Sequence, residues 1–529
     1  MKKRRMTVLI LSAVMLLSAC TGGKRAGISA QGNNSQVSGK ETAAQEQVGK
    51  ESEKGSGRDT LIVALDAEPA KLDPHTQNLP QAHNIQQMIM ETLIKKGENG
   101  DYVPGLAESW EMPDDTTIVF HLRDNVYFHN GEKLTAEDVI YTINRSKTGS
   151  ATKTQFSDID EANTKAIDEL TVEMKLYNPS SAVLNYLATG RGQILNKKAM
   201  EEMGEDAHGR APIGTGPYIF TEWVAGDHVT VTRNENYWGE KPSLKSVIYR
   251  FISDSSIRAI ELESGGVDII YTVGPEDYDR LDENPEIVAL SGPGYTHEIL
   301  QMSMEAEEFS DIRIREAMNI ALDVPAIVQA VYGDMGVAAD SVMSSEIFGH
   351  KSIGPIKRDI ERAKQLVIDA GYPNGFDCEI TVAEDRQTKN MLEIAQAMWK
   401  EAGINVMITT YDQATIRERN AAKLTRFGRS RFNASSGDPD HAMSTWAIGY
   451  AGILNCNDQH IQELLDAGRA EYDAEKRKAI YEELQQYCWN SYYSVPLVFA
   501  YISYACRDNV KGFGFDPSGL PDLTKITLE

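Results

Sequence analysis

The stretch that decides the fold runs from Leu106 to Tyr141 and contains three blocks. They are Leu106-Ala-Glu-Ser-Trp110, Thr116-Thr-Ile-Val-Phe-His-Leu-Arg123 and Val126-Tyr-Phe-His-Asn-Gly-Glu-Lys-Leu-Thr-Ala-Glu-Asp-Val-Ile-Tyr141. The alternation from Thr117 to Arg123 predicts a strand, and Asn130-Gly131 is a strong signal for a tight turn. Thr135 stands three residues before Asp138, which is a carboxylate variant of the capping box and predicts the start of a helix. The stretch therefore predicts strand, turn and helix, and it contains no catalytic group.

These blocks resemble the signature of the family 5 solute-binding proteins, which are the extracellular receptors of peptide and nickel ABC importers. The resemblance covers nearly all of residues 59–529. Its other landmarks are Leu72-Asp-Pro-His75, Gly214-Thr-Gly-Pro-Tyr218, Asn236-Tyr-Trp238, Arg313-Ile-Arg-Glu-Ala-Met-Asn-Ile-Ala-Leu-Asp323 and Gly437-Asp-Pro-Asp440. Together the landmarks are far more specific than any one of them.

Hydrophobic periodicity independently predicts an α/β organisation. Residues 378–382 and 404–410 have strand patterns, residues 388–402 between them have a helical pattern, and Gly403 stands where that helix would end. Such a strand, helix and strand predict a right-handed βαβ unit. Further patterns predict helices at 359–371 and 474–489 and an apolar strand at 495–505.

The resemblance implies a two-lobed α/β fold of the periplasmic-binding-protein type, class II, in its large peptide-receptor form. The first lobe would comprise residues 58–84, 206–297 and 487–529, with residues 85–205 as an accessory subdomain, and the second lobe would comprise residues 298–486. The chain would cross between the lobes near Glu298 and near Tyr487, so that two strands form a hinge. Hinge closure around a ligand is a recognised domain motion, and the closed form would be what the membrane transporter recognises.

The N-terminus predicts export and lipidation. Four basic residues, Lys2 to Arg5, precede an apolar run that ends in Leu17-Ser-Ala-Cys20. This pattern predicts a secretory signal at residues 1–19, and it resembles a bacterial lipoprotein signal, in which the Cys20 thiol carries the lipid. The apolar run is shorter than the roughly 20 residues needed to cross a bilayer. We therefore expect a protein anchored by lipid to the extracytoplasmic face of the cell membrane, at the cell surface or in the periplasm.

Beyond Cys20 the composition becomes polar. Residues 21–57 contain almost no large apolar side chain and predict a disordered linker, with a reach on the order of 30 Å. The net charge of −25 for the whole chain disfavours nucleic acid and anionic lipid headgroups as partners. A solvated acidic surface is sufficient to explain this charge.

The sequence does not determine whether the cysteines form disulfides. Four remain besides Cys20, namely Cys378, Cys456, Cys488 and Cys506. An oxidising exterior permits disulfides, but an even number does not require them. None of the spacings resembles a zinc site.

Motifs of common enzymes are missing from the sequence. It has no Gly-x-Ser-x-Gly elbow, no His-Glu-x-x-His, no Walker motif and no Rossmann glycine pattern. We therefore expect a monomeric receptor without turnover, cofactor or metal, which delivers a peptide or peptide-like solute to ABC permease subunits. The alternatives left open are a receptor for a nickel chelate, with His441 beside Asp440 as a ligand, a receptor for an opine or sugar, and a sensor or hydrolase on the same scaffold.

The resemblance also implies ligand contacts from both lobes. In the first lobe these are Gln77 and Asn78, in the loop after Leu72-Asp-Pro-His75, and Tyr271 and Thr272 at a strand end. The second lobe would contribute Arg429, Arg431, Asn433, Ser435, Asp438, Asp440 and Trp446. Ordinary roles remain open for several of them, since Tyr271 suits a half-buried strand end, the two aspartates suit a turn, and Trp446 suits a core.

Ser435 departs from the family's pattern. In the dipeptide and oligopeptide receptors an Asp four residues before the proline, here Pro439, pairs with the α-ammonium of the ligand, and such a charge-assisted contact is strong. A serine hydroxyl accepts a hydrogen bond but cannot neutralise that charge. Arg429 and Arg431 alternate in a β-like run, so both side chains face one side and suit a carboxylate if that side is the cleft, whereas a solvated strand edge is the alternative. We therefore expect a modified, acidic or amine-blocked peptide, or a related small anion, rather than a generic free dipeptide.

Overall fold

The computed structural model of the protein describes residues 58–77, 79–97, 101–448 and 452–529. The predicted signal, Cys20, the predicted linker and Asn78 lie outside these residues. None of the helices in the described ranges is both long enough and apolar enough to cross a bilayer.

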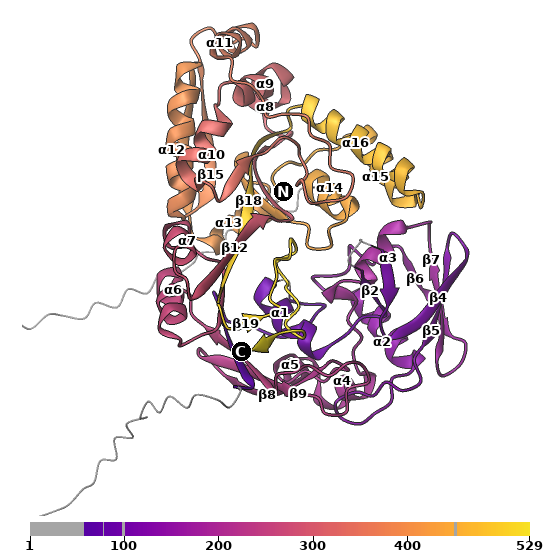
Figure 1. Ribbon diagram of the computed structural model, residues 1–529. Helices are drawn as coiled ribbons and strands as arrows, with labels where there is room; N and C mark the ends of the chain where they lie inside the picture. Colours follow the sequence, from indigo (N-terminus) through magenta and orange to yellow (C-terminus); the bar gives the residue numbers. More distant parts are fainter. Residues whose placement is uncertain (1–57, 78, 98–100, 449–451) are drawn as a thin grey trace, which may run out of the picture. The chain divides into compact units, whose positions relative to one another are not determined.

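One mixed sheet of twelve strands organises the described chain (Figure 1). Ten strands follow the order β16-β15-β17-β13-β18-β11-β1-β10-β9-β8, and β12 and β14 also pair with β18. Their bounds are β1 Thr60–Leu65, β8 Tyr218–Val224, β9 His228–Arg233, β10 Ser246–Phe251, β11 Ile269–Tyr271, β12 Ile287–Pro293, β13 Thr296–Met302, β14 Gly336–Ala338, β15 Phe376–Ala383, β16 Ile404–Tyr411, β17 Phe427–Asn433 and β18 Ser494–Arg507.

Strand β18 joins the two halves of this sheet. Its first residues pair with β13 and β14, and its last seven, Tyr501 to Arg507, pair with β12. Strands β12 and β13 follow one another in the chain and both run antiparallel to β18. The chain therefore passes between the two halves of the sheet at residues 293–296 and again within β18, at about residues 498–501. The predicted second crossing, near Tyr487, falls in the helix before β18.

Three smaller sheets complete the strands of the described residues. A four-stranded antiparallel sheet has the order β4-β5-β7-β6, and two pairs are formed by β2 with β3 and by β19 with β20. The bounds are β2 Ile94–Lys96, β3 Tyr102–Pro104, β4 Ala107–Asp114, β5 Thr117–Leu122, β6 Ile159–Ala166, β7 Thr171–Leu176, β19 Val510–Lys511 and β20 Thr527–Leu528.

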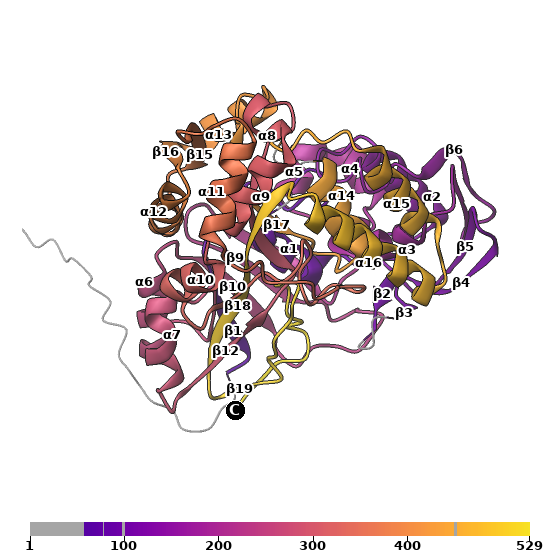
Figure 2. The ribbon, with the colours of Figure 1, turned by 90° about the horizontal axis from the view of Figure 1, so that it is seen from above.

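Helices cover the sheets and build the segments between them (Figures 1 and 2). Their bounds are α1 Pro80–Ile89, α2 Ala136–Ser146, α3 Ser181–Leu187, the 3₁₀ turn η1 Gly190–Gly192, α4 Lys197–Met203, α5 Glu205–Arg210, α6 Ser255–Ser264, α7 Pro275–Asp282, α8 Glu307–Ser310, α9 Ile312–Ile320, α10 Val324–Tyr332, α11 Ile360–Asp369, α12 Arg386–Glu401, α13 Gln413–Ala421, α14 Pro439–Ile448, α15 Gln459–Ala470 and α16 Ala474–Asn490.

The fold-deciding stretch folds as its sequence predicts. Strand β5 is the alternating strand, and the turn after it is closed by a hydrogen bond from the Phe128 N–H to the Glu132 carbonyl, with Gly131 at a φ of 85°. Helix α2 begins after Thr135, whose backbone N–H donates to the Asp138 carboxylate at 3.0 Å. The reciprocal cap satisfies donors that the first turn of a helix leaves free.

The predicted βαβ unit is also confirmed. Strands β15 and β16 pair in parallel from Phe376 opposite Ile404, and α12 connects them. Helix α12 starts at the N-cap Asp385, and Gly403 follows it at a φ of 80°, a conformation that favours glycine. The other predicted elements are found as α11, α16 and β18.

Buried apolar side chains gather into separate cores along the chain. Residues of β4–β7, α2 and α3 form one core, around Phe120. A second surrounds β1, β10 and the end of β18, and a third surrounds β13, β15–β17 and α9–α12. Cys488 and Trp489 of α16 pack with Trp446 in a fourth, beside β13. The end of α16 therefore belongs with the half of the sheet that contains β13.

Candidate functional site

A large cavity in the described residues has a volume of about 1850 Å³. It is lined from both halves of the large sheet and from the segment that carries the four-stranded sheet. The contributing segments are residues 83–97, 101–103, 181–193, 237–243, 346–348, 435–438, 472–477 and 515–525, with Pro217 and Tyr295. A cavity enclosed by segments so far apart in sequence is where separately folded parts meet, which is a common location for a ligand site.

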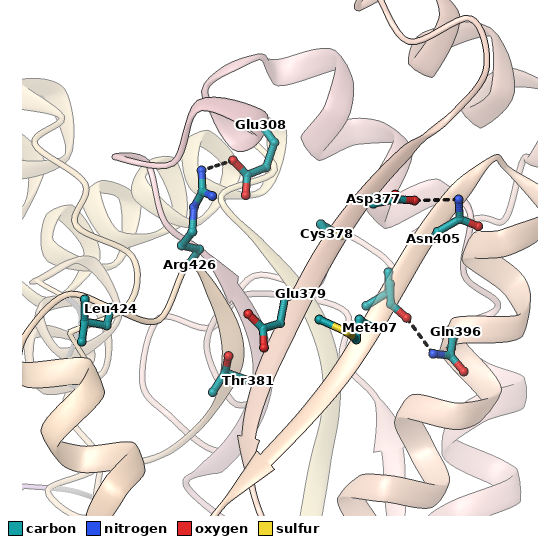
Figure 3. Close-up of a pocket in the computed structure, with 11 residues that line it drawn as sticks. Glu308, Asp377, Cys378, Glu379, Thr381, Gln396, Asn405, Met407, Leu424 and Arg426 are labelled. Carbon is teal, nitrogen blue, oxygen red and sulfur yellow. Dashed lines mark hydrogen bonds and ion pairs between the residues drawn. The ribbon is translucent and has the colours of Figure 1, made fainter.

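A second, smaller cavity of about 670 Å³ lies against β15 and β16 (Figure 3). Four of its polar side chains are paired with one another, since Arg426 binds Glu308, and Asn405 donates to Asp377 at 2.9 Å. The Cys378 thiol at its edge is buried, and burial raises its pKa to about 12, so it is an unreactive thiol at neutral pH.

Asp438 lies on the wall of the large cavity and is bound on two sides. Arg477 donates to both carboxylate oxygens, at 2.9 and 2.8 Å, and Asn185 of α3 donates to one of them at 3.1 Å. Burial opposes the charge of Asp438, but Arg477 outweighs it and holds the pKa of the carboxyl below its usual value. Asp438 therefore links α3 to α16 across the cavity and already has a cation of its own.

Asp440 makes a parallel link close by. It accepts hydrogen bonds from the Tyr186 hydroxyl at 3.0 Å and from Arg469 at 3.1 Å. Both aspartates also stabilise the turn before α14, because the Asp440 N–H donates to the Asp438 carboxylate. The two aspartates therefore stabilise a turn, which is the structural role that the sequence left open. They also contact Asn185, Tyr186, Arg469 and Arg477, and no local sequence pattern predicts those contacts.

Three further contacts join the same segments. The Lys96 ammonium donates to the Ser436 carbonyl, Ser181 donates to the Arg469 carbonyl at 3.0 Å, and the Tyr472 hydroxyl accepts from the Ser180 N–H at 3.2 Å. These contacts join α3 and β2 to the segment before α14 and to the end of α15, and Figures 1 and 2 show the end of α15 close to α3.

Arg429 and Arg431 surround Glu298 of the neighbouring strand. Arg429 donates to this carboxylate at 3.0 Å and to Thr388 at 2.6 Å, and the Arg431 guanidinium lies 3.5 Å from Glu298. Glu298 also accepts from the Tyr332 hydroxyl at 2.8 Å. The two arginines share one side of β17, as the alternation predicts, but they are not among the residues that line the large cavity.

The other candidates of the predicted second lobe differ in position. Ser435 lines the cavity and is partly exposed, whereas Asn433 is exposed at the end of β17 and is not among the lining residues. Trp446 is fully buried in the core beside β13. Of the predicted contacts in this lobe, the structure brings Ser435 and Asp438 to the cavity wall.

The candidates of the predicted first lobe lie apart from the wall. Tyr271 is buried, and its ring packs against Tyr504 and Phe513. Thr272 is exposed at a φ of 59°, and Gln77 is partly exposed. None of these three is among the residues that line the large cavity.

Two of the sequence landmarks converge on one cavity residue, Glu91. Its carboxylate accepts from Thr215 at 3.1 Å, from Tyr237 at 2.7 Å and from the Trp238 indole at 2.8 Å. A Cβ added at Gly214 would overlap the Ile89 carbonyl oxygen. The segments Gly214-Thr-Gly-Pro-Tyr218 and Asn236-Tyr-Trp238 therefore brace the end of α1, which is a structural role.

Several side chains of the wall gave no signal in the sequence. His83, Asn185, Arg191 and Gln193 are all at least nine-tenths buried and line the cavity. They lie in unremarkable polar positions of α1, α3 and η1, and no motif or periodicity distinguishes a lining polar residue from a surface one. Only a three-dimensional arrangement identifies them.

The described residues contain no group of three or more His, Cys, Asp or Glu side chains that could hold a metal ion. His441 packs against Tyr186, its Nδ1 lies 3.0 Å from the Ser436 hydroxyl, and burial lowers its pKa to about 3. The four cysteines left open by the sequence, Cys378, Cys456, Cys488 and Cys506, are all free thiols.

Fold and cavity together define a solute-binding protein built around one mixed sheet whose two halves are joined by long strands. The sequence profile of the bacterial extracellular solute-binding proteins, family 5, matches residues 101–452. The chain belongs to this family, and it is a solute-binding receptor rather than an enzyme, as the sequence predicts.

Individual relatives agree with this assignment. Heme-binding protein A of Haemophilus influenzae is 25% identical, with all of both chains covered. The dipeptide-binding protein of Escherichia coli K12 is 24% identical, with 89% of this chain and 95% of that protein covered. Among solved structures, the binding protein AgaA from A. tumefacien R10, in complex with agropinic acid, is 29% identical with a TM-score of 0.77, covering 89% of this chain and 99% of AgaA.

A structure of NikA from Brucella suis in complex with Fe(III)-EDTA superimposes with a TM-score of 0.79 at 23% identity, covering 89% of this chain and all of NikA. At that identity the likeness concerns the fold alone. The α/β fold of the periplasmic-binding-protein type, predicted from the sequence, is confirmed.

Proposed function

We propose that this protein is a lipid-anchored receptor that captures a peptide or peptide-like solute and delivers it to the permease of an ABC importer. The observation that carries the proposal is the cavity of about 1850 Å³ in a chain of a solute-binding family. Its volume exceeds that of a typical small-ligand pocket, about 300–1,000 Å³, and is ample for a short peptide. Relatives named for binding dipeptide and glutathione support this class of solute.

We further propose that the cavity closes by rotation of two lobes. The predicted division has residues 58–84, 206–297 and 487–529 in the first lobe, residues 85–205 as an accessory subdomain and residues 298–486 in the second. The packing of the end of α16 beside β13 supports a second boundary later than predicted, at about residues 498–501. Passage of the chain at residues 293–296 and 498–501 supports two strands as the hinge. In this arrangement the contacts of Asp438 and Asp440 with α3 join the two lobes and stabilise the closed form.

Two positions on the cavity wall support a solute without a free α-ammonium. Ser435 stands where an acid would neutralise such a group, and Asp438 is occupied by Arg477. Arg429 and Arg431 are engaged by Glu298, so any carboxylate of the solute would be bound by other cations. We therefore propose an amine-blocked or otherwise modified peptide as the preferred solute.

A thermal-shift screen of the processed protein tests this function. The compounds would be free and N-acetylated peptides, glutathione, opines, sugars and nickel chelates, with calorimetry on the hits. A ligand that prefers the folded state raises the melting temperature by mass action, and it should also lower the radius of gyration in small-angle scattering. If many unrelated free dipeptides bound with micromolar affinity, or if Ser435→Asp left their binding unchanged, the proposed preference would be wrong.

Lipid anchoring has a separate test. Labelled palmitate should enter the wild-type protein in growing cells but not a Cys20→Ser variant. Equal labelling of both proteins would remove the anchor from the proposal without affecting solute binding.

A further inference from the structure

Two hydrogen-bond donors on the antiparallel pair of β2 and β3 line the large cavity. Lys96 and Tyr102 stand directly opposite one another in this pair, and opposed residues extend their side chains from the same face of two paired strands. Both residues are among those that line the cavity. Both also lie within the electrostatic reach of Asp438 and Arg477 on the cavity wall. The ammonium and the phenol hydroxyl therefore face the same part of the cavity.

The Lys96 ammonium is held at the wall without a carboxylate partner. It donates to the carbonyl of Ser436, which also lines the cavity. Lys96 is exposed, and no carboxylate of the described residues forms an ion pair with its ammonium. An ammonium has three donors, and the carbonyl occupies one of them. Two donors therefore remain for a group inside the cavity.

The neighbouring charges do not neutralise this ammonium. The carboxylate of Asp438 is already engaged by Arg477 and Asn185. Asp516 attracts Lys96 from another part of the cavity lining, without direct contact. Burial lowers the pKa of Lys96 in spite of both aspartates, which shows that the charged form lacks full compensation.

Tyr102 supplies a second donor beside the first. Its hydroxyl forms no hydrogen bond with another described residue, yet its oxygen is not among the buried atoms that lack a partner. The oxygen is therefore accessible from the cavity. Burial, assisted by the charge of Asp438, raises the pKa of Tyr102 above its ordinary value of about 10. The hydroxyl is thus protonated at neutral pH and is able to donate.

We propose that Lys96 and Tyr102 bind a carboxylate group of the solute. The two oxygens of a carboxylate accept from both donors at once, and the contact with the ammonium is charge-assisted. The inference rests on the proposed function, because it takes the large cavity as the solute site. It names a cation for the solute carboxylate in place of Arg429 and Arg431, which Glu298 engages. Lys96 and Tyr102 are then specificity-determining residues.

Peptide pairs that differ by one carboxylate test this assignment. The first pair is N-acetyl-trileucine as the free acid and as the C-terminal amide. The second pair is the amidated N-acetyl tripeptides Leu-Glu-Leu and Leu-Gln-Leu, which places the carboxylate on a side chain. Binding to the processed protein is measured by calorimetry at pH 7. In at least one pair we expect the carboxylate form to bind roughly ten- to a hundredfold more tightly, which is the effect of a hydrogen bond to a charged group.

Variants of the two donors locate the effect. Lys96→Met removes the charge and keeps an apolar stem, and Tyr102→Phe removes only the hydroxyl. Each should weaken the carboxylate form by about tenfold or more and leave the uncharged form unchanged, which shows that the cavity is intact. Tyr102→Phe also serves as the second variant should Lys96→Met fail to fold.

Lys241→Met is the matched control for long-range attraction. Lys241 lines the same cavity, its side chain is 49% exposed, and its nearest carboxylate, of Glu235, is 3.9 Å away. The substitution removes the same charge from another part of the lining. It should leave the preference for the carboxylate form unchanged.

The outcomes distinguish this inference from the proposed function. Equal binding of both members of each pair, or an unchanged preference in both Lys96→Met and Tyr102→Phe, would overturn the inference and leave the receptor function standing. An equal loss of preference in Lys241→Met would overturn it as well, because the effect would then come from the net charge of the cavity. If no peptide bound to the wild type, the peptide-like solute would be refuted and the inference with it.

Discussion

Removal of the Arg477 guanidinium tests the buried ion pair at the cavity wall. Arg477 donates two hydrogen bonds to Asp438 and a third to the Gly468 carbonyl at 3.0 Å. The side chains of Arg477 and Asp438 are only 10% and 3% exposed. Arg477→Met keeps much of the apolar stem but leaves the Asp438 carboxylate buried without its cation.

The expected loss of unfolding free energy can be worked out from this geometry. Removing one partner of a buried ion pair costs about 3–5 kcal/mol, because an uncompensated charge remains in a medium of low dielectric constant. Asn185 still donates to Asp438, and Lys96 remains nearby, so the lower end of this range, about 3 kcal/mol, is expected. The double variant Asp438→Asn with Arg477→Met should recover most of the loss, since this pair then leaves no uncompensated charge.

Urea unfolding at pH 7, monitored by tryptophan fluorescence, measures the change. The matched control is Arg386→Met, which removes another arginine–carboxylate contact of 2.8 Å, to Glu276, where both side chains are more than three-quarters exposed. Exposed pairs contribute little, so the control should unfold like the wild type. A loss in Arg477→Met no larger than in Arg386→Met, or a double variant as unstable as the single one, would refute the reasoning.

Two other predictions concern stability at acid pH and the close backbone packing of Gly214 against Ile89. Burial holds the pKa of several histidines far below the usual 6.5, so these histidines take up protons at a higher pH in the unfolded chain than in the folded one. Their contribution to the free energy of unfolding should be fully present above pH 6.5 and should be lost as the pH drops toward 4. The expected loss is about 1.4 kcal/mol per pH unit for each histidine. The histidines are His75, His83, His297 and His441. In urea titrations between pH 7 and 4.5, His83→Phe should reduce this slope by one histidine's share, and an unaltered slope would contradict the assignment. Gly214→Ala should lower the melting temperature by several degrees because its Cβ would overlap the backbone of Ile89. Gly514→Ala, which has open space around it, should melt like the wild type. Equal melting temperatures of the two variants would contradict this prediction, because the backbone near Glu91 would then move at little cost.

Local signals in the sequence determined the secondary structure where they were strong. The cap of Thr135 with Asp138, the turn at Asn130-Gly131 and the helical period before Gly403 all involve residues within a few positions of one another. Backbone hydrogen bonding and side-chain period act over that range, so the pattern alone predicts α2 and α12. The landmarks added the family, and with it the fold.

The two arginines of β17 mark the limit of such reasoning. Alternation correctly placed Arg429 and Arg431 on one side of the strand, because the side-chain period of a strand is two. Which surface that side meets depends on the neighbouring strand, where Glu298 lies opposite Arg431. No property of residues 427–433 contains that information.

Tertiary structure alone decided the composition of the cavity wall. His83, Asn185 and Gln193 belong to different segments, and Asn185 meets Asp438 across 253 positions of the chain. A buried polar side chain looks like a surface one in the sequence, because its environment is made by residues that only packing brings near. The sequence by itself therefore determined the elements and the family, while the orientation of polar groups around the cavity was decided by contacts between distant segments.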